Sequence, residues 1–328
     1  GNSIEYFSLT AGAKADRALM EGVDDSWKRV PGGAGIETLV NTLIKTYNPA
    51  DPSASIQQLI AIYRRINALA DGYWKKKKLA EVQQLIEACS GLWIEATVHQ
   101  AYGIKDQSVP VQLQLVNRSK LGIDLDGISI NRTDTGWNQN LEPEKNYRLL
   151  IQVSLAGLPV SQPYWLEEPM SENSYNVKNQ ELIGDAQNRP ALTAVFKIKI
   201  AGQVFQIRKP VLYEYTQPAK GESFEPFVII PKMIAACKPE ILLFTGKNEK
   251  DLLVTDQSKQ DHSPSSFPAI VMTKSPGFDI SADLRPGTPQ HEFQVRPAGG
   301  NQNEAWTWAT PSTEGGTDTI MQCRTISY

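Results

Sequence analysis

The alternation of hydrophobic and polar positions is clearest over residues 192–216. From residue 192 to residue 200, apolar side chains alternate with threonine and lysine, and this period of two is typical of a strand with one buried face. Ala201-Gly202 then offers a position that accepts a positive φ, and residues 204–207 resume the alternation. Pro210 has no N–H to donate and ends regular pairing on one edge. The segment therefore predicts a β-hairpin.

Three segments before residue 92 have the period of an amphipathic helix. The apolar stripe of residues 36–47 repeats at i, i+3, i+4 and i+7, and Asn48-Pro49 stops it. Similar stripes cover residues 51–70 and 76–89, and a glycine follows each of them. Three consecutive helices with short connections predict a small antiparallel bundle.

After Gly91 the sequence returns to short alternating stretches that are separated by turn residues. The first set comprises residues 93–99, 109–116, 123–130 and 147–155, together with the hairpin. A second set of shorter strands runs from residue 227 to residue 326. Many short strands at this spacing predict sandwiches of immunoglobulin-like type.

These patterns predict an α+β multidomain chain, a small helical bundle followed by two immunoglobulin-like β-sandwich domains. Its 328 residues exceed the roughly 100–200 of one domain. The expected parts are residues 1–91 (irregular segment plus three-helix bundle), 92–216 (first sandwich), 217–225 (linker) and 226–328 (second sandwich). Because the chain opens on Gly1 and its last residues resemble an interrupted strand, we expect a fragment of a longer protein with the second sandwich truncated.

Charge narrows the range of partners. The formal net charge is -3 and the pI is about 5.8, so the chain lacks the excess of positive charge that is typical of nucleic-acid-binding proteins. No stretch approaches the roughly 18–20 apolar residues of a membrane span. The run Lys75-Lys76-Lys77-Lys78 begins the third predicted helix, where positive charge opposes the helix dipole. A solvated helix end explains it, and an anionic partner is the alternative.

Candidate catalytic and metal-binding motifs are missing from the residue pattern. The histidines His99, His262 and His291 stand far apart, and no Cys-x-x-Cys or nucleophile elbow occurs. We therefore predict no catalytic, cofactor-binding or metal-binding residue in this chain. Three cysteines are too few for a disulfide framework, so we expect buried or idle thiols. Pairing of Cys237 with Cys323 is the alternative in an oxidising compartment.

The most site-like stretch contains Tyr164, Trp165, Glu167 and Glu168 in a loop bounded by proline. Aromatic faces stack on sugar rings and carboxylates accept hydroxyl protons, so the stretch predicts a possible recognition surface for carbohydrate. Neighbouring glutamates on a strand point to opposite sides, which argues against an acid–base pair. We favour structural anchoring of the loop for these residues, with carbohydrate recognition as the alternative.

Four short stretches together resemble one known family. They are residues 22–33 (GVDDSWKRVPGG), 109–119 (VPVQLQLVNRS), 161–169 (SQPYWLEEP) and 208–213 (RKPVLY). They are similar to the region downstream of the catalytic domain in large, usually exported bacterial members of the PIG-L (LmbE-like) zinc-dependent de-N-acetylases. The resemblance covers roughly residues 5–245.

The resemblance implies a parent protein that hydrolyses the N-acetyl group of an amino sugar. In that family a His-Pro-Asp-Asp motif and a distant histidine hold zinc, and an aspartate acts as base on the metal-bound water. This chain lacks those motifs, so zinc is expected only in a catalytic domain upstream. The resemblance also implies a periplasmic or extracellular location. By its position, the segment with Asp24, Asp25, Trp27 and Arg29 is expected to pack against that upstream domain.

Two functions of different classes follow. The first is a non-catalytic accessory region that supports or orients the deacetylase. The alternative is a carbohydrate-binding or adhesive β-sandwich module whose own surface, around Tyr164 and Trp165, holds a glycan. An exposed aromatic platform beside a groove favours the second, and burial of Trp165 favours the first.

Overall fold

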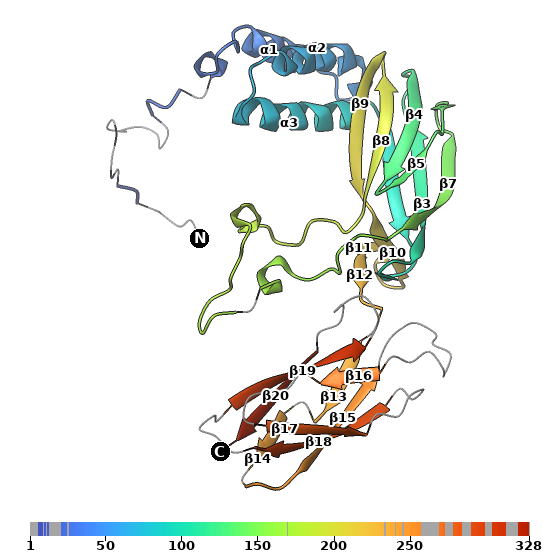
Figure 1. Cartoon of the computed structure of the whole chain (residues 1–328). Helices are drawn as coiled ribbons and strands as arrows, with labels where there is room; N and C mark the ends of the chain where they lie inside the picture. The colour runs from blue at the N-terminus through green and yellow to red at the C-terminus, as the bar shows by residue number, and fades with distance from the viewer. Residues whose placement is uncertain are drawn as a thin grey trace.

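The computed structural model of the chain shows mostly β-sheet with a few helices (Figure 1). It describes residues 6–8, 10, 12, 21–24, 26–168, 170–232, 234–239, 241–244, 246–256, 269–272, 278–283, 290–298, 304–312 and 321–327. Within that part of the chain, no helix is long and apolar enough to cross a membrane.

The helices form where the period of 3.6 predicts them. A short 3-10 turn, η1 (Trp27–Arg29), precedes α1 (Ile36–Thr46), η2 (Pro52–Ser55), α2 (Ile56–Asn67) and α3 (Tyr73–Cys89). α2 buries most of its apolar stripe, whereas α1 buries only Ile36 completely and leaves Leu39 and Ile44 exposed, as is Tyr47 just after its end. The predicted stripe of α1 is thus only partly covered by the described residues.

Two sheets make the first β unit, which we define as strands β1–β12. One sheet has the order β11-β10-β1-β3-β7, and the other has the order β5-β4-β8-β9 with β6 beside β4. Their strands are β1 (Leu92–Val98), β3 (Ser108–Asn117), β4 (Ile123–Ile130), β5 (Thr133–Thr135), β6 (Gln139–Asn140), β7 (Asn146–Ser154), β8 (Thr193–Ile200), β9 (Gln203–Pro210), β10 (Leu212–Gln217) and β11 (Gly221–Pro226). A parallel pair, β2 (Tyr102–Ile104) and β12 (Val228–Ile230), completes the unit.

The predicted hairpin is the pair β8–β9. The two strands pair antiparallel from Ile200 and Gln203 outward, and the turn residues Ala201 and Gly202 have φ of 47° and 86°. Two positive φ values in a two-residue turn match the right-handed twist of the flanking strands. Phe196 and the isoleucines beside it on β8 are fully buried, so the alternation places them in the core as expected.

One continuous hydrophobic core joins the helices to the first β unit. It contains buried residues of α2, α3 and both sheets. The rings of Tyr63 on α2 and Phe205 on β9 meet edge to face at 5.1 Å between centroids, and Glu87 on α3 pairs with Lys209 on β9. Burial of this apolar surface is the main term that holds the helices on the sheet, and the half-buried ion pair adds to it.

The second β unit, which we define as strands β13–β20, has a separate core. One sheet has the order β13-β15-β18-β17 and the other β14-β20-β19-β16. The strands are β13 (Ala235–Lys238), β14 (Ile241–Phe244), β15 (Lys250–Asp256), β16 (Ala269–Met272), β17 (Phe278–Asp283), β18 (Gln290–Pro297), β19 (Glu304–Ser312) and β20 (Met321–Ser327). Its described core centres on Phe244, Val254 and Phe293, all nearly inaccessible to solvent.

Residues 217–225, predicted as a linker, are not a free connection. They include the end of β10, a turn and most of β11, which pair antiparallel. The polar composition of the stretch predicted a linker. Its backbone nevertheless pairs with β10, while most of its side chains stay exposed. The chain then continues into β12, which belongs to the first β unit.

Candidate functional site

The irregular segment between β7 and β8, residues 155–192, is here called the long loop. It contains the 3-10 turns η3 (Tyr164–Leu166) and η4 (Gln180–Leu182). Its base is fixed to β12, since the Ser161 N–H donates to the Ile229 carbonyl at 2.8 Å and the Ile229 N–H donates to Ser161 Oγ at 2.9 Å. A scaffold that fixes the base lets an irregular loop carry binding residues.

The two arms of the long loop are tied together through Tyr164. Its N–H donates to Asn188 Oδ1 at 3.0 Å, and its hydroxyl donates to the Asp185 carbonyl at 3.3 Å. The Tyr164 and Trp165 rings pack edge to face, with centroids 4.9 Å apart, and both side chains are half-buried. The two aromatics predicted as a recognition platform therefore anchor the loop to itself.

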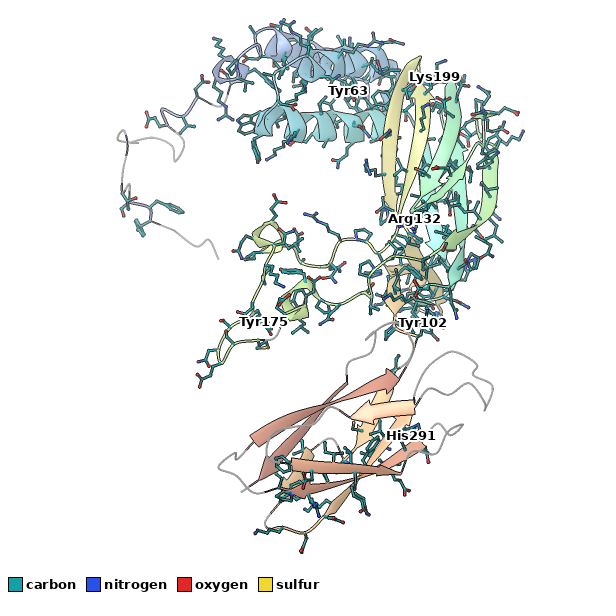
Figure 2. All side chains as sticks on the ribbon, viewed as in Figure 1. Tyr63, Tyr102, Arg132, Tyr175, Lys199 and His291 are labelled. Atoms are coloured by element: carbon teal, nitrogen blue, oxygen red, sulfur yellow. The ribbon has the colours of Figure 1, made fainter. Side chains whose placement is uncertain are left out.

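Beside this anchor lies an open hollow of about 670 Å³, here called the loop hollow. Its lining residues are Glu168, Tyr175, Asn176, Val177, Lys178 and Gln180. Figure 2 shows Tyr175 on the part of the long loop that extends away from the strands. Of the four residues predicted for recognition, only Glu168 lines the loop hollow; Glu167 is exposed nearby.

The side chains of the loop hollow supply hydrogen-bonding groups and one ring. Glu168 Oε1 pairs with the Lys178 ammonium group. Gln180 Nε2 donates to the Val177 carbonyl at 2.6 Å, which leaves Gln180 Oε1 as an acceptor. Tyr175 is 53% exposed. The signal missed in the sequence was this single tyrosine within the polar run of residues 171–179, where turn composition hid it.

A second, smaller cavity of about 240 Å³ lies where the chain passes from β9 in one sheet to β10 in the other. Glu95 on β1 and Phe224 on β11 are among its lining residues. Burial raises the pKa of the Glu95 carboxyl, and the negative charges of Glu222 and Glu214 raise it further, while Arg118 and Lys209 oppose the shift.

The end of the N-terminal segment, just before the helices, contacts α3 and the core. Trp27 packs against the core, and the Arg29 guanidinium lies 4.2 Å from the centroid of the Trp74 ring on α3. Asp24 accepts from the Ser26 N–H at 2.9 Å, and hydrogen bonds from Ser26 lower the pKa of its carboxyl. Asp25 lies outside the described residues. Because Arg29 stays exposed, it remains accessible to a neighbour.

The other chemical candidates are distributed through the chain. His99 is exposed, His291 is buried, and His262 lies outside the described residues. A search of the described residues finds no group of three acidic, histidine or cysteine side chains that would hold a metal. In the lysine run, Lys76 and Lys77 are exposed, as a solvated helix end predicts. Lys75 and Lys78 are half-buried: the Lys75 ammonium group donates to the Leu69 carbonyl at 2.9 Å, and Lys78 pairs with Glu81 at 2.6 Å.

The cysteines differ from one another. Cys89 is free and partly buried, and burial raises the pKa of its thiol. Cys237 is buried and disulfide-bonded, so the expectation of a buried or idle thiol is wrong at that position and the alternative, a paired Cys237, applies. The side chain of Cys323 lies outside the described part of the chain.

Comparisons with known proteins identify no family. No protein-family model matches the chain, and no curated protein matches it either. Among solved structures, it is similar to domains 4 and 5 of the S-layer protein SbsC (11% identity, TM-score 0.22, 41% of this chain and 64% of that one). It is also similar to red sea bream transglutaminase (8% identity, TM-score 0.38, 79% of this chain and 34% of that one).

A third solved structure, domains 1–6 of surface layer protein SbsC, shows 6% identity and a TM-score of 0.23 over 89% of this chain and 63% of that one. The chain spans less than two thirds of the length of each of these three. At such identities and TM-scores these likenesses carry no argument about function.

Proposed function

We propose that this chain is the non-catalytic accessory region of an exported PIG-L-like zinc-dependent N-deacetylase that acts on N-acetylated amino sugars. In this proposal the helices form a small bundle, and the two β units are immunoglobulin-like sandwiches that support and orient an upstream catalytic domain. The zinc and the base belong to that domain.

The observation that best supports a binding role is the chemistry of the loop hollow. Glu168 pairs with the ammonium group of Lys178 at an open surface. An ion pair beside an exposed ring and amide groups is suited to hold a ligand and not to transfer protons to it.

The N-terminal segment is the surface proposed to contact the catalytic domain. Arg29 stacks on Trp74, so its guanidinium plane is fixed while its N–H groups remain exposed for carboxylates of a neighbour. Trp27 holds the segment on the core beneath it. Together they present Arg29 as a rigid, charged contact.

The proposed location outside the cytoplasm is supported by Cys237. Disulfides persist in oxidising compartments such as the periplasm and the cell exterior, and are rare in the cytosol. A disulfide-bonded Cys237 agrees with such a compartment.

Charge reversal at Arg29 tests the proposed contact. The chain is mixed with a separately produced PIG-L-like catalytic domain, and complex formation is followed by sedimentation velocity. We expect a complex that Arg29→Glu weakens about tenfold through lost charge complementarity. Lys199→Glu, an equal charge change at an exposed side chain of β8, should leave it unchanged. Absence of any complex, or equal weakening by both variants, would contradict the proposal.

A further inference from the structure

We propose that the loop hollow binds a neutral saccharide of one or two rings, stacked on Tyr175 and hydrogen-bonded by Gln180 and the Glu168–Lys178 pair. The inference deepens the proposed function, since it names the ligand class of the accessory region. It rests on that function only for the expectation that amino sugars are the natural ligands.

The ring of Tyr175 provides the stacking surface. Its side chain is 53% exposed at the rim of a hollow whose volume of about 670 Å³ lies within the usual range for small-molecule sites. The C–H face of a sugar is apolar and its edges carry hydroxyl groups. A tyrosine suits such a ligand because its ring is apolar and its hydroxyl group is polar.

The polar groups around the ring match hydroxyl groups. Each sugar hydroxyl donates one hydrogen bond and accepts others, so its site needs acceptors and donors side by side. Gln180 Oε1 and the carboxylate of Glu168 accept, while the ammonium group of Lys178 donates. Hydrogen bonds that involve a charged partner are the stronger ones.

Charge balance within the lining favours a neutral ligand. Among the described lining residues Lys178 carries the positive charge and Glu168 the negative charge, and the two are paired. A phosphate or carboxylate ligand would have to displace Glu168 from Lys178, and an organic cation would have to displace Lys178 from Glu168. A neutral polyol adds hydrogen bonds to the pair without breaking it.

Local hydrogen bonds hold the segments on either side of the lining residues. Ser171 N–H donates to the Ser174 carbonyl at 3.0 Å just before Tyr175, and Asn179 Oδ1 caps η4 by accepting from the Glu181 N–H at 3.1 Å. Both contacts lie next to lining residues in the sequence. Pre-organised groups lose less entropy on binding, which matters for a weak ligand.

The test is a titration of the whole 328-residue chain with di-N-acetylchitobiose and with cellobiose, followed by isothermal calorimetry and by saturation-transfer NMR. We expect binding of at least one of these disaccharides. Tyr175→Ala should weaken it about tenfold, because the stacking surface is lost. Tyr175→Phe should retain it. Tyr73→Ala removes another exposed tyrosine, on α3, and should leave binding unchanged.

No binding of either disaccharide, or equal binding by wild type and Tyr175→Ala, would overturn the inference. Preference for di-N-acetylchitobiose would connect the hollow to the amino sugars of the proposed function. Preference for cellobiose would retain the saccharide site and count against that connection. Failure of the catalytic-domain complex leaves this titration unaffected, so the two proposals fail separately.

Discussion

At the scale of single residues, burial changes the pKa of Glu95. Glu95 lies half-buried on β1 beside the smaller cavity, and its local charges are the carboxylates of Glu222 and Glu214 and the cations Arg118 and Lys209. Burial is the largest cause of its raised pKa, and the two carboxylates add to it. The folded chain therefore binds this proton more tightly than the unfolded chain does.

The raised pKa of Glu95 makes the stability of the folded chain depend on pH. Between the ordinary pKa of 4.5 and the raised folded-state pKa, the folded chain holds more protons, so stability falls as pH rises through this window and stays lower above it. We predict that Glu95→Gln is more stable than wild type at pH 7, and that the difference vanishes below about pH 4. Urea unfolding across pH measures it, with exposed Glu172→Gln as the matched control. An unchanged or reduced stability of Glu95→Gln at pH 7 would contradict this account.

Residue type alone identified only part of the candidate site. Tyr164 and Trp165 were conspicuous in sequence because large aromatics stood beside two carboxylates, yet the fold uses them to tie the loop arms. Tyr175 was not singled out in the sequence, although the structure exposes it beside the loop hollow. The contacts that shape the loop, such as that of Tyr164 with Asn188, join residues far apart in sequence and leave no local pattern.

At the scale of elements, periodicity predicted those structures whose partners are near in sequence. The three helices and the β8–β9 hairpin occur where expected. The parallel pairs β1–β10 and β2–β12 were not foreseen, because each joins segments more than a hundred residues apart. β11 was also missed, since its side chains are mostly exposed and show no apolar alternation.

The connection between β3 and β4 depends on one buried amide. Asn117 is inaccessible to solvent, and its Nδ2 donates to the carbonyls of Leu121 at 3.0 Å and Leu141 at 2.9 Å. Its Oδ1 accepts from the Ser119 N–H and hydroxyl, each at 3.0 Å. One side chain thus joins the end of β3, the turn after it and the segment before β7.

We predict that Asn117→Ala lowers the free energy of unfolding by about 2–4 kcal/mol, because buried carbonyl and N–H groups lose their partners. Asn140→Ala removes an exposed amide, whose Nδ2 donates to Asp124 Oδ1 at 2.8 Å, and should cost less than about 1 kcal/mol. Chemical denaturation measures both values. Equal losses of unfolding free energy for the two variants would contradict the prediction that burial makes the Asn117 hydrogen bonds more important for stability.

At the scale of the whole molecule, the described residues form two separate hydrophobic cores and the irregular long loop. The helices share the core of the first β unit, while the second unit packs around its own. The long loop is fixed at its base to β12, and Figure 1 shows it running out from the strands of the first β unit. This arrangement agrees with the proposed role of holding a ligand or a neighbouring domain.

The most direct test of this account measures chemistry in the isolated 328-residue chain. The chain is incubated with zinc and di-N-acetylchitobiose, and released acetate is quantified against a buffer blank. We predict that acetate stays at the level of the blank even at concentrations where the disaccharide is bound. Acetate released in proportion to chain concentration would contradict the claim that these residues bind and orient while hydrolysis occurs elsewhere.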